Sequence, residues 1–79
     1  MMESTPLKDA RLLIIGEKIR AIRKSNPQFK NYEVFAFSHG INKVTLSNIE
    51  KGENFTMESL LKVLDALGIK LSEFFRDIE

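Results

Sequence analysis

Residues 31–52 have the sequence NYEVFAFSHGINKVTLSNIEKG, which predicts two short helices in close succession. Asn31 can cap a helix over residues 32–39, and Asn42 can cap a second helix over residues 43–51. An asparagine at these positions accepts hydrogen bonds from backbone amides that have no partner in the first helical turn. We therefore expect each helix to begin directly after its asparagine.

The connection between the two helices is predicted to be a tight turn at Gly40. A helix often ends at a residue in the left-handed conformation, which glycine adopts without steric cost. Ile41 follows as an apolar residue that can fill the space between the helices. The residues expected to face the core are Phe35, Ala36, Leu46 and Ile49.

The outer face of the second helix carries small, hydrogen-bonding side chains and one positive charge. Its residues are Lys43, Val44, Thr45, Ser47 and Asn48. A helix that enters the major groove of DNA needs such a face, because base edges offer hydrogen-bond donors, acceptors and the thymine methyl group. We therefore predict that these five residues contact bases.

The chain before this pair contains one longer helix. Residues 1–9 lack periodicity and are predicted to form a flexible arm. Apolar residues three or four positions apart then predict an amphipathic helix over residues 9–25. The stripe consists of Leu12, Ile15, Ile19 and Ile22. Leu13 and Ile14 widen it, so we expect the start of this helix to be covered on more than one side. Gly16 would be explained by a close crossing with another helix, since glycine weakens a helix.

The chain after the pair predicts two further helices. Thr56 can cap a helix over residues 57–67, and a short helix over residues 71–77 follows. The remaining segment, 26–30, is predicted to be a loop whose phenylalanine returns to the core. With no predicted strands, the fold class is an all-α domain of five helices over residues 10–79.

Composition excludes several classes of function. The 79 residues lack cysteine, and one histidine without neighbouring carboxylates at ligand spacing makes a metal site improbable. No nucleophile–histidine arrangement, glycine-rich phosphate loop or paired carboxylates suggests an enzyme. We expect no cofactor, no small-molecule ligand, no membrane span and a cytoplasmic location. Residues 1–51 carry nine Lys and Arg against five Asp and Glu, so the positive charge is concentrated in the half that contains the helix pair.

Several segments together resemble the Cro and phage-repressor helix-turn-helix family, also called XRE-type regulators. The segments are IGEKIRAIRK at 15–24, HGI at 39–41, LSNIEKG at 46–52 and MESLLKVLDALGIKLSEFF at 57–75. The resemblance implies a lambda-repressor-like domain whose second and third helices bind double-stranded DNA. It further implies that Lys43, Val44 and Asn48 contact base edges.

The resemblance also implies contacts to the DNA backbone. These involve Tyr32, Lys51 and Asn54. In the segment 51–54, backbone amides would bind the next phosphate. This chain departs from the family pattern in the longer loop before Tyr32, in Tyr32 itself, where glutamine is common, and in the apolar Val44. A tyrosine hydroxyl can still donate to a phosphate, and a valine can contact a thymine methyl group.

The remaining expectations concern stability and assembly. Glu50 is predicted to pair with Arg20 or Arg23 rather than to contact DNA. The DNA-contacting helix over residues 43–51 of a single chain covers only a few base pairs, so we expect a homodimer on a pseudo-palindromic operator. Its predicted interface consists of Phe74, Phe75 and Ile78. The alternative is a protein–protein adaptor that uses the surface of the last two helices.

Overall fold

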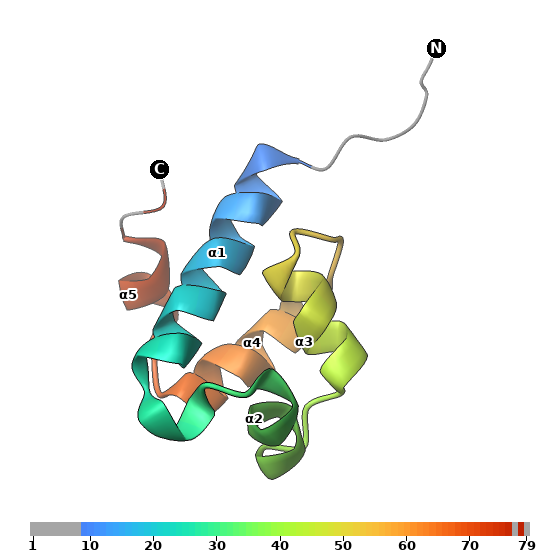
Figure 1. Ribbon diagram of the computed structural model, residues 1–79. Helices are drawn as coiled ribbons and strands as arrows, with labels where there is room; N and C mark the ends of the chain where they lie inside the picture. The colour runs from blue at the N-terminus through green and yellow to red at the C-terminus, as the bar shows by residue number, and fades with distance from the viewer. Residues whose placement is uncertain (1–8, 77, 79) are drawn as a thin grey trace.

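The computed structural model describes residues 9–76 and 78, and in this part of the chain the regular structure is entirely helical (Figure 1). The elements are α1 (Ala10–Ser25), the 3-10 helix η1 (Pro27–Phe29), α2 (Tyr32–Ser38), α3 (Lys43–Glu50), α4 (Met57–Leu67) and α5 (Leu71–Phe75). The predicted five-helix all-α fold is thus confirmed. The predicted arm lies outside the described residues, apart from Asp9, which caps α1.

The predicted helix starts are confirmed at the level of single hydrogen bonds. The Asn31 side chain accepts from the amides of Glu33 and Val34 at 2.9 and 3.2 Å. Asn42 binds the first turn of α3 in the same way, at 2.8 and 3.2 Å. Thr56 accepts from an amide in α4 at 3.1 Å. These caps fix where α2, α3 and α4 begin, because they satisfy amides that the helix itself cannot.

The turn between α2 and α3 has the predicted conformation. Gly40 is left-handed, with φ of 66°. The amide of Ile41 donates to the carbonyl of Ala36 at 2.8 Å, and the Ile41 side chain is buried. This turn sets the angle between the two helices and closes it with an apolar side chain.

Helix α1 packs directly on the end of α3, as the glycine in its middle predicts. A Cβ atom at Gly16 would overlap the carbonyl oxygen of Ile49 and press on that of Glu50. Figure 1 shows α1 running past α3 and α4, with α5 on its other side. The absence of a side chain at Gly16 therefore permits this backbone approach.

The core lies between α1 and the four later helices. Its fully buried members are Ile19, Phe35, Ala36, Leu46, Ile49, Leu60, Val63, Leu64 and Phe74, and Ile41 is almost fully buried. Phe29 packs against this core from η1, as predicted for the loop. None of the described helices is long and apolar enough to cross a membrane.

Two expectations about burial are wrong. Leu13 packs on Gly52, but Leu13 and Ile14 remain 38% and 39% exposed, so residues 9–76 and 78 do not fully cover the start of α1 on a second side. Phe74 has no exposed surface because it fills the core beneath α1, so it cannot offer its side chain to a dimer interface. Phe75 remains 36% exposed, and Ile78 is half-buried against the core.

Candidate nucleic-acid interface

Helix α3 presents the predicted base-contacting residues on the side away from the core, but not equally. Lys43 and Val44 are exposed, and Val44 is 60% exposed although it is apolar. Thr45, Ser47 and Asn48 are half-buried. Thr45 lies on the flank that faces Ser59 and Lys62 of α4, and Ser47 lines the cleft toward α1 and α2. The outer ridge of α3, formed by Lys43, Val44 and Asn48, therefore contains fewer residues than the five predicted to contact bases. Thr45 and Ser47 lie on its flanks.

Lys43 forms an ion pair that the sequence did not indicate. Its Nζ lies 3.2 Å from Oε2 of Glu33 in the first turn of α2. The two side chains are 62% and 52% exposed, so solvent screens the pair and its contribution to stability is small. The ten-residue separation passes through a turn, and only the angle between α2 and α3 brings the two groups together. Sequence spacing alone had no signal for it.

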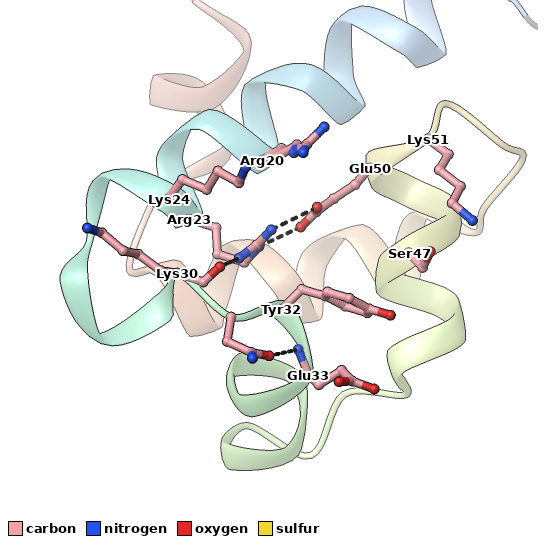
Figure 2. A pocket seen from close by; sticks show the side chains of 10 residues that line it. Arg20, Arg23, Lys24, Lys30, Tyr32, Glu33, Ser47, Glu50 and Lys51 are labelled. Atoms are coloured by element: carbon pink, nitrogen blue, oxygen red, sulfur yellow. Dashed lines mark hydrogen bonds and ion pairs between the residues drawn. The ribbon is translucent and has the colours of Figure 1, made fainter.

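A buried charge cluster fixes α3 against α1. The Arg23 guanidinium binds both carboxylate oxygens of Glu50, with Nε to Oε2 at 2.7 Å and a second nitrogen to Oε1 at 3.0 Å. It also donates to the carbonyls of Phe29 and Lys30 at 2.8 and 2.6 Å. Arg23 is only 2% exposed. Of the two arginines predicted as partners of Glu50, the structure selects Arg23 (Figure 2).

An open cleft of about 520 Å³ lies beside this cluster, between α1, α2 and α3. Its lining residues are Arg20, Arg23, Lys24, Lys30, Asn31, Tyr32, Glu33, Ser47, Glu50 and Lys51. Figure 2 shows the Tyr32 ring extending across the cleft toward α3, with Lys51 at the far end of α3. Because Arg23 and Glu50 neutralise each other, the remaining charges of the lining leave it positive. The cleft thus brings two predicted phosphate-contacting residues, Tyr32 and Lys51, to one positive surface.

The loop after α3 differs from the expectation based on the family. The amides of Lys51, Gly52 and Glu53 donate to the carbonyls of Ser47, Ile49 and Asn48 at 3.0, 3.1 and 2.8 Å. These bonds finish α3, so the three amides are not available to bind a phosphate, and the expectation is wrong for them. Lys51 and Asn54 have exposed side chains, and those predicted contacts stay predictions.

His39 has a structural environment. Its ring packs on Phe29 and Phe35, with ring centroids 5.2 and 4.8 Å away, and Nδ1 lies 3.0 Å from the Phe35 carbonyl oxygen. Among the residues that the structure describes, no three His, Cys, Asp or Glu side chains are grouped to hold a metal ion. His39 therefore serves the packing of the α2 end against η1.

Comparison with known proteins covers the same region. A family model described as helix-turn-helix matches residues 19–74, which include α2 and α3. The chain is also 37% identical over 65 residues to a protein named Control protein C.MunI, from Mycoplasma sp.. That alignment spans 81% of this chain and 86% of the relative.

Proposed function

Because this chain belongs to the XRE-type helix-turn-helix family of non-enzymatic, DNA-binding transcription regulators, we propose that it recognises a specific pseudo-palindromic operator as a homodimer. The observation that carries this proposal is the exposed ridge of α3 beside a positive cleft. A ridge of this kind supplies the base contacts, and the cleft supplies the phosphate contacts that set its register on the duplex. The protein would act in the cytoplasm, on double-stranded DNA.

The chemistry of the ridge supports recognition of particular bases. Val44 is the apolar group best placed to contact a thymine methyl, and Asn48 has the amide that pairs with adenine N6 and N7. Lys43 can donate to the O6 and N7 atoms of guanine. Thr45 and Ser47, on the flanks, would contact bases or phosphates at the edges of the half-site.

The cleft supports binding of the DNA backbone. Among the described residues, Arg20, Lys24 and Lys30 have no ion-pair partner. Tyr32, at the start of α2, is 38% exposed, and its hydroxyl can donate to a phosphate. Lys51, at the far end of the same cleft, and the Asn54 side chain in the loop after α3 would also bind the backbone. Such contacts supply affinity that does not depend on sequence but falls with salt.

The surface formed by α4 and α5 supports contact with a second copy of the chain. A groove of about 420 Å³ between α4 and α5 includes Leu61, Ile69 and Leu71 in its lining. Leu71 and Phe75 are 45% and 36% exposed, and Ile78 is half-buried. To read two adjacent half-sites, a two-fold dimer through this surface would have to hold its two α3 helices about 34 Å apart, one turn of DNA.

The similarity to a control protein supports a more specific role. Small stand-alone regulators of this family include controllers of restriction–modification operons, mobile-element repressors and antitoxins, and this similarity favours the first of the three.

The test is selection from a random duplex pool with the purified protein at about 150 mM salt. We expect enrichment of a pseudo-palindrome with half-site centres one helical turn apart. If no motif is enriched and binding at low salt is also absent, the regulator proposal fails. The alternative would then be a protein–protein adaptor that binds through the α4–α5 surface.

A further inference from the structure

The ion pair between Glu33 and Lys43 lies where an acidic side chain is unexpected. Glu33 follows Tyr32 at the cleft that is proposed to bind phosphates, so its carboxylate opposes DNA there by charge repulsion. Its favourable interaction with the N-terminus of α2 would not require contact with Lys43. Yet Glu33 reaches across to the first residue of α3, 3.2 Å from the Lys43 ammonium. The pair therefore places the Lys43 ammonium next to the first turn of α2, while its contribution to stability is small.

A lysine at the start of a recognition helix has two kinds of acceptor on DNA. Its ammonium is a point charge on a flexible stem, so it can bind a phosphate of any sequence. It can also donate to the neutral O6 and N7 atoms of guanine, which carries sequence information. The ammonium has three hydrogens, so Lys43 can keep its bond to Glu33 and still donate to both guanine atoms. A phosphate at the same place would bring a second anion next to the Glu33 carboxylate.

We propose that Glu33 is a specificity-determining positioning residue, which holds the Lys43 ammonium for a guanine edge and keeps it from phosphates. This inference rests on the proposed function, because it assigns a role within the α3 interface. Glu33 would lower affinity for DNA in general and raise the preference for the operator. A residue that only stabilised the fold would change neither the preference nor its dependence on salt.

The experiment compares the selected operator duplex with a shuffled duplex of equal length over a series of salt concentrations. The proteins are the wild type, Glu33→Gln, Lys43→Met and the double variant. We expect Glu33→Gln to bind the shuffled duplex about tenfold tighter, with a salt slope steeper by about one, as one more phosphate is contacted. Binding to the operator should change less than about threefold, so the specificity ratio falls. In the Lys43→Met background, Glu33→Gln should leave that ratio unchanged.

Glu58→Gln is the matched control, because it removes one exposed carboxylate from the first turn of α4, outside both the cleft and the α4–α5 groove. It measures the effect of net charge alone and should leave the specificity ratio at the wild-type value. The inference is overturned if Glu33→Gln increases the affinity for both duplexes by the same factor, whether or not Lys43 is present. If the wild type itself shows no salt-dependent binding to either duplex, the proposed function fails, which is a separate result.

Discussion

Arg23 is a charged residue that the fold has removed from water, so its partners must compensate for the lost hydration. An unpaired buried charge is far more costly than a paired one, and this asymmetry decides what a substitution does. Glu50, with its side chain 10% exposed, supplies the only carboxylate among the described contacts of Arg23. The two carbonyl bonds to the end of η1 complete the guanidinium geometry.

Glu50→Gln should therefore destabilise the protein strongly. The substitution keeps the shape but leaves the Arg23 charge without its counter-ion, which costs about 3 kcal/mol. Urea denaturation followed by circular dichroism measures the change. Glu58→Gln, an exposed position in α4, is the control and should stay within about 0.5 kcal/mol of the wild type. A Glu50→Gln protein as stable as this control would show that the cluster is not important for folding.

Asp9 allows a prediction about pH. Its side-chain hydrogen bond with Arg11, a backbone hydrogen bond and the nearby guanidinium lower the pKa of Asp9 from 3.8 to about 2. Since the folded pKa is depressed, the stabilisation is present above about pH 4 and is lost as the pH falls through 2. Arg11→Met should raise the pKa of Asp9 toward its ordinary value in a carboxyl NMR titration. An unchanged titration would contradict the assigned cause.

At the scale of the elements, the crossing of α1 and α3 depends on one missing side chain. Replacing an exposed glycine in a helix by alanine usually stabilises the protein by about 1 kcal/mol. Gly16→Ala should do the opposite and destabilise by about 2 kcal/mol, because the new Cβ meets a backbone carbonyl that cannot rotate away. Thermal unfolding tests this. Ala21→Gly, at an exposed position of the same helix, gives the size of the propensity effect alone.

Helix α3 should be separable into a folding face and a binding face. Lys43→Ala together with Asn48→Ala should abolish the preference for the operator, since each lost base contact costs about 1–3 kcal/mol. The melting temperature should stay nearly unchanged, because the core contacts of α3 come from Leu46 and Ile49. Binding isotherms with operator and shuffled duplexes, together with thermal unfolding, check both halves. A large loss of stability would place these two residues in the fold.

The elements also mark where sequence reasoning succeeds. Caps at Asn31, Asn42 and Thr56 and the turn at Gly40 are local devices, so their residues alone predicted them. The contacts that sequence missed depend on how distant segments meet. Pairing of Lys43 with Glu33 needs the angle between helices. The burial of Phe74 rather than Phe75 depends on how α5 is rotated against the core, which five residues of helix cannot reveal by periodicity.

At the scale of the whole molecule, the α4–α5 surface lies apart from α3 and is the proposed site of dimerisation. Phe75→Glu should convert a wild-type dimer to a monomer, because a buried, unpaired carboxylate at the interface is costly. Sedimentation at protein concentrations on the order of tens of micromolar, above the Kd of a dimer of micromolar affinity, measures the assembly state. Phe37→Glu, which alters an 88% exposed phenylalanine on α2, is the control and should remain dimeric. Loss of the dimer only in Phe37→Glu would move the interface to α2.

The guanidinium of Arg23 holds both the entry to α2, through the carbonyls before it, and the exit of α3, through Glu50. Arg23 thereby holds α2 and α3 in a fixed position relative to α1. In the proposed dimer, the α4–α5 surface then determines the spacer length of the operator, whereas the α3 ridge determines which bases are recognised. Base recognition and spacer length are therefore separable. Replacing the α3 ridge with that of another protein would change the recognised bases and keep the spacer length.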